Sequence, residues 1–280
     1  MKIIHKIKDM MSLSDDFRKQ SKIIGFVPTM GYLHEGHLSL IRRAKQECDI
    51  TVVSIFVNPI QFGKNEDFDR YPRDLQRDLD MMKDLNVDVV FNPSSEEMYP
   101  KGYSTFVDIE SNITKTLCGK SRPGHFKGVA TVVTKLFNII TPHKAYFGQK
   151  DAQQCVVIKK MVNDLNMKVD IVVCPTVREK DGLAMSSRNT YLSGRERRIA
   201  PVLYKTLQMA QRMIELGEKD SKKILKEMSK KINKYRSIKI DYISIVDPET
   251  LEDIEIISGK VLIALAVKIG KTRLIDNIII

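Results

Sequence analysis

The sequence predicts an α/β protein with a Rossmann-like, doubly wound parallel sheet and a second, smaller α+β C-terminal domain. Residues 50–58 (ITVVSIFVN) form a nearly all-apolar, β-branched run, the kind of strand that is buried on both faces of a parallel sheet. Strand-like and helix-like segments alternate up to residue 178, which is typical of a doubly wound sheet. Beyond it, two helical patterns precede two strand patterns. We therefore expect domains at residues 1–178 and 179–280.

The first domain is expected to open with a βαβ unit, made of strand 23–28, amphipathic helix 37–47 and the buried strand 50–58. The alternation then continues with further elements of each kind. Its remaining helices are expected at 73–85, 129–139 and 152–165, and its remaining strands at 87–91, 145–147 and 169–174. The second domain is expected to contain helices 195–216 and 221–235 and strands 238–246 and 261–267.

The composition is that of a globular chain of 280 residues, 42% of them hydrophobic, which can bury a sizeable core. The sequence contains no run of about 18 apolar residues, so it predicts no membrane-spanning helix. The start MKIIHKIKDM lacks the apolar stretch of a signal peptide. We therefore expect a cytoplasmic protein with no membrane partner. The four cysteines form no C-x-x-C pair, which indicates reduced thiols rather than disulfides or a zinc site. They are Cys48, Cys118, Cys155 and Cys174.

The net charge of +11 raises the possibility of a nucleic-acid partner. The clearest lysine cluster lies in residues 221–235, where the lysines alternate with apolar residues at helical spacing. This pattern is typical of an amphipathic helix with a solvated basic face. We therefore expect no nucleic-acid partner, and we attribute the charge to overall composition and to a site for small anions.

Two histidines mark the entrance to the first helix of the βαβ unit, in GFVPTMGYLHEGHLSLIRRAK (residues 25–45). A zinc-protease motif needs histidines four residues apart on one helical face, whereas His34 and His37 are three apart with Gly36 between them. A metal site is therefore disfavoured. Helix capping and phosphate binding remain open.

Phosphate binding explains more of this loop than capping alone. A helix N-terminus presents unpaired N–H groups and the positive end of the helix dipole, and Gly31 and Gly36 let a ligand approach the backbone. Two imidazoles at this place can donate hydrogen bonds to phosphate oxygens whose charge grows as pyrophosphate departs. The loop lacks both the dinucleotide fingerprint G-x-G-x-x-G and the Walker motif.

The segment HEGH resembles the H-x-G-H motif of nucleotidyltransferases and class I aminoacyl-tRNA synthetases, which also carry a basic, serine-containing loop like AMSSRN at residues 184–189. Further motifs narrow the resemblance to the pantoate–beta-alanine ligase (pantothenate synthetase) family, from the first strand to the last. They are PTMGYLHEGH (28–37), FVNPIQF (56–62), SRPGHFKGV (121–129), YFGQKDAQQ (146–154), DGLAMSSRN (181–189) and RLIDN (273–277).

The resemblance implies a ligase of the pantothenate and coenzyme A pathway that uses ATP, pantoate and beta-alanine. Pantoate would attack the α-phosphate of ATP to give pantoyl adenylate and pyrophosphate, and beta-alanine would then displace AMP to give pantothenate. The smaller C-terminal domain would close over the active site. Within enzymes, a nucleotidyltransferase that stops at the nucleotide adduct is the main alternative, and a class I tRNA synthetase is a weaker one. A nucleic-acid-binding protein is the alternative from another class.

The resemblance also assigns residues to ATP. His37 would be the proton donor, and His34 and Lys150 would join it on the phosphates as catalytic residues. Lysine suits a phosphate as a compact charge and arginine as a bidentate fork, and Asp151 would serve the ribose or orient a neighbour. The implied ATP-binding residues are Met30, Gly31, Tyr32, Leu33, His34, Glu35, Gly36, His37, Gly148, Gln149, Lys150, Asp151, Val177, Met185, Ser186, Ser187 and Arg188.

For pantoate, the resemblance implies the two neutral amides of Gln61 and Gln154, with Asn58 as a weaker candidate. Gln61 follows a buried strand, where ligands of parallel sheets bind. Mg²⁺ is expected to accompany ATP, held largely by phosphate oxygens and water, and Asp78 is our candidate protein ligand. A solvated helix acid is an equally good interpretation of Asp78. A homodimer is expected from the family alone.

Overall fold

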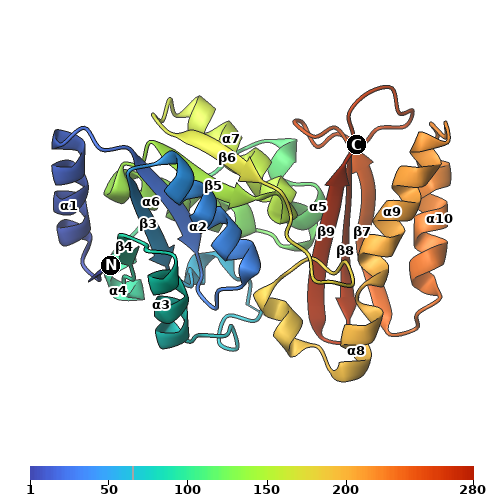
Figure 1. Cartoon of the computed structure of the whole chain (residues 1–280). Coiled ribbons are helices and arrows are strands. Elements are labelled where there is room, and N and C mark those ends of the chain that lie inside the picture. The colour runs from blue at the N-terminus through green and yellow to red at the C-terminus, as the bar shows by residue number, and fades with distance from the viewer. Residues whose placement is uncertain (65) are drawn as a thin grey trace. The chain divides into compact units, whose positions relative to one another are not determined.

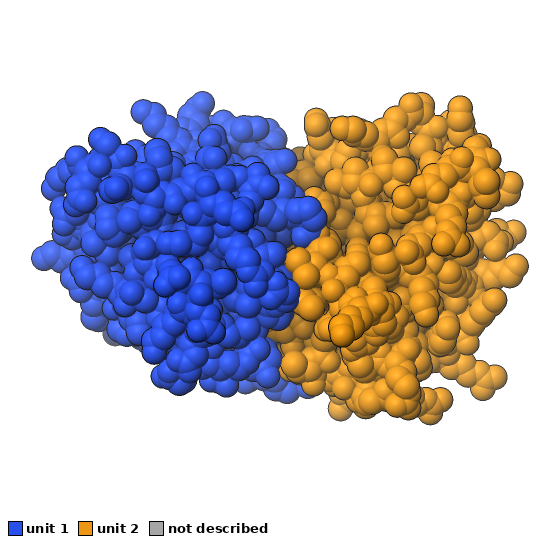
Figure 2. Space-filling model, viewed as in Figure 1, with its two compact units in different colours: residues 1–110, 122–148, 157–175 blue, residues 111–121, 149–156, 176–280 orange. Residues whose placement is uncertain are grey.

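The protein forms two compact units in a computed structural model that describes residues 1–64 and 66–280 (Figures 1 and 2). Unit 1 comprises residues 1–110, 122–148 and 157–175, and unit 2 comprises residues 111–121, 149–156 and 176–280. Unit 2 therefore contains residues 111–121 and 149–156 as well as the C-terminal part of the chain. Whether residues 1–178 and 179–280 behave as separate domains stays a prediction.

Unit 1 is built on a six-stranded parallel sheet with strand order β1-β4-β3-β2-β5-β6. The strands are β1 (Lys2–Ile4), β2 (Ile24–Thr29), β3 (Ile50–Ile55), β4 (Val89–Phe91), β5 (Lys144–Gly148) and β6 (Asp170–Cys174). From β2 the chain runs to one side through β3 and β4, and it then restarts at β5 on the other side of β2. Ligands of such sheets bind where the order reverses, at the carboxyl ends of β2 and β5.

The helices of unit 1 follow from apolar faces that the sheet buries. α2 packs on β2, β3 and β5, and its Leu38, Ile41 and Ala44 enter a core with Val27 of β2 and Val53 of β3. The helices are α1 (Ile7–Lys19), α2 (Glu35–Glu47), α3 (Leu75–Asp84), α4 (Ser95–Met98), α6 (His125–Ile140) and α7 (Ala152–Asp164), whose first residues belong to unit 2. A 3₁₀ turn, η1 (Pro59–Gln61), follows β3.

Unit 2 contains an antiparallel sheet with order β7-β8-β9, and α9 and α10 pack against one face of it (Figure 1). In α10, Ile224, Met228 and Ile232 are fully buried while most of its lysines are exposed, which confirms the predicted basic solvent face. The elements are η2 (Asn112–Thr114), α5 (Leu117–Ser121), η3 (Gln149–Asp151), η4 (Ser187–Tyr191), α8 (Gly194–Ile199), α9 (Val202–Glu215), α10 (Ser221–Asn233), β7 (Ile238–Val246), β8 (Leu262–Ile269) and β9 (Thr272–Ile279).

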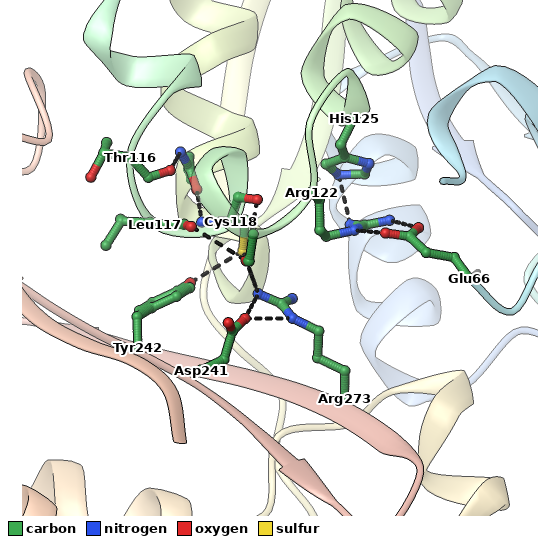
Figure 3. Close-up of polar contacts among 11 residues, drawn as sticks. Glu66, Thr116, Leu117, Cys118, Arg122, His125, Asp241, Tyr242 and Arg273 are labelled. Carbon is green, nitrogen blue, oxygen red and sulfur yellow. Dashed lines mark hydrogen bonds and ion pairs between the residues drawn. The ribbon is translucent and has the colours of Figure 1, made fainter. Parts of the chain in front are cut away.

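A polar cluster binds the segment 111–121 to the antiparallel sheet of unit 2 (Figure 3). The Cys118 Sγ atom lies 3.2 Å from the Tyr242 hydroxyl and 3.4 Å from Nη2 of Arg273. Arg273 also donates to Asp241 from Nε at 2.9 Å and from Nη2 at 2.7 Å. Gln153 accepts the backbone N–H of Cys118 at 2.9 Å. These contacts explain why α5 groups with the second unit.

The fold confirms the predicted α/β class with a small α+β part, and it corrects several elements. β1, α1 and β9 were not predicted, and β1 is too short, at three residues, to show a period. The expected helix 195–216 is divided into α8 and α9 near Pro201, because proline lacks the N–H that a continuous helix needs. β3 ends at Ile55, before the η1 turn.

Within the described residues, no helix is long and apolar enough to cross a bilayer. The four cysteines are free thiols, and Cys118, Cys155 and Cys174 are buried.

Candidate active site

The loop after β2 carries the two histidines and is fixed by backbone contacts. Gly31 and Tyr32 both have positive φ, +79° and +51°, so the chain turns sharply away from the strand. The hydroxyl of Thr29 accepts the Gly31 N–H at 3.1 Å and donates to the Ser54 carbonyl of β3 at 2.7 Å. The loop therefore starts from a defined position at the carboxyl end of β2.

Asp78 of α3 holds the middle of this loop. Its Oδ2 accepts the Tyr32 N–H and its Oδ1 accepts the Leu33 N–H, each at 2.7 Å, and the residue is 1% exposed. Burial raises the pKa of Asp78, while the two backbone N–H groups and the nearby Arg77 act in the opposite direction. Arg77 also donates to the Leu33 carbonyl at 2.9 Å.

These contacts bear on the magnesium role expected for Asp78. Both carboxylate oxygens already accept short backbone hydrogen bonds, and the side chain is shielded from solvent, so the geometry favours a loop-holding role over a metal ligand. Asp78 is not the solvated helix acid of the alternative interpretation either. Among residues 1–64 and 66–280 there is no group of three or more metal-ligating side chains that could hold a metal ion.

The two histidines form a reciprocal cap at the start of α2. The Gly36 N–H donates to Nδ1 of His34 at 3.2 Å, and the His34 N–H donates to Nδ1 of His37 at 3.3 Å. Because both Nδ1 atoms accept, the hydrogen-bond network assigns the ring proton of each neutral imidazole to Nε2. Capping thus selects the tautomer with an Nε2–H donor, and the two open interpretations, capping and phosphate binding, are compatible.

The two imidazole rings lie close together, with centroids 4.1 Å apart and planes inclined by 35°. They sit at the N-terminus of a 13-residue helix, whose dipole favours an anion at this end. Glu35, the first residue of α2, forms an ion pair with Arg42 of the same helix. The pair of Nε2–H donors and the helix end together make a site suited to phosphate oxygens.

The second group of predicted ATP residues lies in unit 2, around Asn277 of β9. The side chain of Asn277 donates to the carbonyls of Gln149 and Lys150, at 3.0 and 2.9 Å, and accepts from the Gln149 side chain at 3.1 Å. Lys150 in turn lies 3.6 Å from the Asp151 carboxylate. Asn277 therefore fixes the turn that carries the catalytic lysine candidate.

The neighbouring residue Asp276 fixes the loop that leads to the serines. It is 2% exposed and receives two hydrogen bonds from Arg178, at 2.7 and 3.0 Å. Burial raises the pKa of Asp276, and the Arg178 guanidinium opposes that rise. Arg178 also stacks on Tyr204, with its Cζ 3.8 Å from the ring centroid. The loop from residue 177 to 185 is thereby tied to β9.

This loop brings the remaining predicted residues of unit 2 together. The Met185 N–H donates to the Val177 carbonyl at 3.0 Å, so these two lie side by side. Ser186 caps η4 by accepting the Arg188 N–H at 3.3 Å. Ser187 is 6% exposed. The predicted ATP residues thus form two groups, residues 30–37 with Gly148 in unit 1 and residues 149–151, 177 and 185–188 in unit 2.

The amides predicted for pantoate also divide between the units. Gln61 lies at the end of η1 in unit 1, where it contacts Asn58 and Met30. Gln154 is half-buried on the first turn of α7, in a segment of unit 2. The neighbouring Gln153 is buried, and its side chain forms three hydrogen bonds with the backbone of the segment 111–121.

Sequence reasoning missed Arg178, Asp276 and Asn277 as organising residues. The motif RLIDN contains both Asp276 and Asn277. An Asp-Asn pair inside the otherwise apolar end of the chain was the available signal, because a buried polar pair needs hydrogen-bond partners.

The doubly wound sheet and the H-x-G-H loop beside its switch point are typical of a nucleotide-binding α/β enzyme. The family model described as pantoate-beta-alanine ligase matches residues 2–279. This chain belongs to the pantoate–beta-alanine ligase family, as its motifs predicted.

Named relatives cover the whole chain. The pantothenate synthetase of Acetivibrio thermocellus is 59% identical over 280 residues, which is 100% of this chain and 99% of that protein. That of Thermosipho africanus is 61% identical, with 100% of both chains covered. Among solved structures, pantothenate synthetase from Thermus thermophilus has a TM-score of 0.94 at 43% identity, covering 99% of each chain. The pantoate-beta-alanine ligase from Francisella tularensis, complexed with beta-gamma ATP and beta-alanine, has a TM-score of 0.84 at 42% identity, covering 99% of this chain and 97% of that one.

Proposed function

We infer that this chain catalyses the ATP-dependent condensation of pantoate with beta-alanine to pantothenate, with release of AMP and pyrophosphate. The family membership over residues 2–279 supports the overall reaction. The observation that carries the chemistry is the reciprocal cap of His34 and His37, which presents two Nε2–H donors at the start of α2.

In the first step a carboxylate oxygen of pantoate attacks the α-phosphate of ATP, and the bond to the bridging oxygen of pyrophosphate breaks. Charge develops on the departing phosphates, and donors fixed in advance stabilise it at no reorganisation cost. We assign His34, His37 and Lys150 to these oxygens, where His37 donates a hydrogen bond from its Nε2–H. Ser186, Ser187 and Arg188 are assigned to the same phosphates.

In the second step the amine of beta-alanine attacks the acyl carbon of pantoyl adenylate, and AMP leaves. The adenylate makes a carboxylate reactive because AMP is a far better leaving group than oxide. No covalent bond to a protein side chain is needed. We propose that Gln61 and Gln154 bind pantoate, and that residues 179–280 close over the adenylate and protect it from water.

Mg²⁺ is proposed to enter with ATP. The described residues offer no protein cage for it, and both oxygens of Asp78 are taken by backbone N–H groups. We propose that the ion is held by phosphate oxygens and water. We further propose a cytoplasmic homodimer, from the family resemblance alone. Light scattering of the purified protein tests the dimer.

The reaction is tested by AMP release from ATP with pantoate and beta-alanine supplied together and separately. The ligase assignment predicts sustained AMP release only when both are present. A nucleotidyltransferase that stops at the adduct would release pyrophosphate and no AMP. Nucleic-acid retention that weakens with salt, without ATP turnover, would instead favour a nucleic-acid-binding protein.

A further inference from the structure

The start of α6 packs directly against the backbone of Gln61. A Cβ at Gly128 would lie 2.5 Å from the Ile60 carbonyl oxygen and 2.6 Å from the Gln61 Cα, so the helix and η1 are in direct backbone contact. The Nδ1 atom of His125, the first residue of α6, lies 2.9 Å from the Gln61 carbonyl oxygen. These contacts place His125 directly against the residue assigned to pantoate.

The tautomer of His125 follows from its other neighbour. Nη1 of Arg122 lies 2.9 Å from Nε2 of His125, and a guanidinium can only donate, so Nε2 must be the acceptor (Figure 3). His125 is then a neutral imidazole with its proton on Nδ1, directed at the Gln61 carbonyl.

Arg122 is in turn held by Glu66, which accepts from Nε at 2.7 Å and from Nη2 at 2.5 Å. The Arg122 side chain is 14% exposed and that of Glu66 is 23% exposed. Such a two-point pair fixes the plane of the guanidinium. Glu66, Arg122 and His125 therefore form a polar chain that ends on the backbone of Gln61.

The orientation of the Gln61 amide can also be assigned. Asn58 is 1% exposed, and its Nδ2 faces the Gly128 carbonyl at 3.1 Å, which can only accept. Oδ1 of Asn58 accepts from the Tyr99 hydroxyl at 2.8 Å, so the second N–H of Nδ2 donates to Oε1 of Gln61 at 3.0 Å. The Gln61 oxygen is thus occupied. Its NH₂ group contacts the Met30 sulfur at 3.2 Å, which is a weak acceptor.

We propose that His125 is a positioning residue for substrate binding, which through the chain from Glu66 fixes Gln61 so that its NH₂ group donates to an acceptor oxygen of pantoate. This proposal rests on the proposed function, because Gln61 is the residue assigned there to pantoate. His125 acts through the Gln61 backbone and does not touch the substrate.

Three substitutions of His125 separate its two nitrogen positions. His125→Asn keeps an N–H donor near the Nδ1 position, His125→Gln places its amide near the Nε2 position, and His125→Ala removes both. We expect His125→Ala and His125→Gln to raise the pantoate KM about tenfold with the ATP KM within twofold of wild type, because one hydrogen bond is lost. His125→Asn should stay within about threefold of wild type. His143→Ala is the control, because His143 accepts from Ile24 N–H at the opposite end of β2.

Gln61→Ala and the double variant Gln61→Ala with His125→Ala complete the design. If His125 acts only through Gln61, the double variant has the pantoate KM of Gln61→Ala alone. An unchanged pantoate KM in both His125→Ala and His125→Gln, or equal impairment of His125→Asn, would overturn the positioning role. An unchanged pantoate KM in Gln61→Ala would instead remove Gln61 from pantoate binding, which is a failure of the proposed function. Circular dichroism establishes whether each variant is folded. If His125→Ala does not fold, the comparison of His125→Asn with His125→Gln tests the proposal.

Discussion

Replacing Asp78 by Asn separates a loop-holding carboxylate from a magnesium ligand. In the native protein its two oxygens accept the N–H groups of Tyr32 and Leu33, each at 2.7 Å. An amide has only one oxygen, so one of these bonds survives as a neutral hydrogen bond, and the NH₂ group faces the other backbone N–H. That second donor loses its partner in a buried position.

The expected destabilisation follows from these contacts. Hydrogen bonds to a charged acceptor contribute about 1.5–3 kcal/mol each, a neutral bond about 1 kcal/mol, and an unsatisfied buried donor costs about 1–3 kcal/mol. Because a neutral amide is easier to bury than a carboxylate, part of this loss is offset. We expect a net loss of about 2–3 kcal/mol, a fall in Tm of about 4–10 °C, and slower adenylation because His34 follows the displaced loop.

The assay compares thermal unfolding and the Mg²⁺ dependence of adenylation in Asp78→Asn and in Asp80→Asn. Asp80 lies on the same helix, is exposed, and pairs with Lys83 at 3.6 Å, so its loss should cost no more than about 0.5 kcal/mol. The loop-holding role predicts that the Mg²⁺ concentration for half-maximal rate is unchanged in Asp78→Asn. A native Tm together with a strongly raised Mg²⁺ requirement would refute it.

Three further outcomes are expected. His37→Asn keeps an acceptor near Nδ1 for the cap but removes the Nε2–H donor, so adenylation should fall by about 10²- to 10³-fold with little change in Tm, as measured by single-turnover kinetics and calorimetry; a matching fall in Tm would mean that His37 only caps. Asn277→Ala should raise the ATP KM about tenfold more than the pantoate KM, because it frees the carbonyls of Gln149 and Lys150; an equal rise in both would contradict this. Burial raises the pKa of Glu66, but the hydrogen bonds from Arg122 outweigh this effect and lower it, so the ionised carboxylate stabilises the fold at neutral pH and this stabilisation is lost as pH falls below about 4.3. Glu66→Gln should reduce this loss of stability in acid, as measured by unfolding at a series of pH values, and an unchanged pH profile would contradict the prediction.

The sequence predicted the architecture because its signals were local. The β-branched run 50–58 and the alternation of strand-like and helix-like segments indicated the parallel sheet. HEGH indicated the start of a helix with side chains suited to phosphate binding. β9 was missed because Arg273, Asp276 and Asn277 interrupt the apolar pattern that marks a buried strand.

The contacts that organise the site are long-range, and no local pattern contains them. Asp78 meets Leu33 across 45 residues, His125 meets Gln61 across 64, and Asn277 meets Lys150 across 127. The helical period of α3 does place Asp78 correctly, because Asp78 lies four residues before Met82 on the buried face. On that face a solvated or metal-binding acid is unexpected without partners.

The most direct test of the proposed adenylation is exchange of labelled pyrophosphate into ATP. Reversible formation of pantoyl adenylate, with no protein nucleophile and no amine, predicts exchange when pantoate and ATP are present and beta-alanine is absent. Exchange should also require pantoate. Exchange that strictly needs beta-alanine would contradict a free-standing adenylate, and exchange without pantoate would contradict pantoate as the group that attacks the α-phosphate.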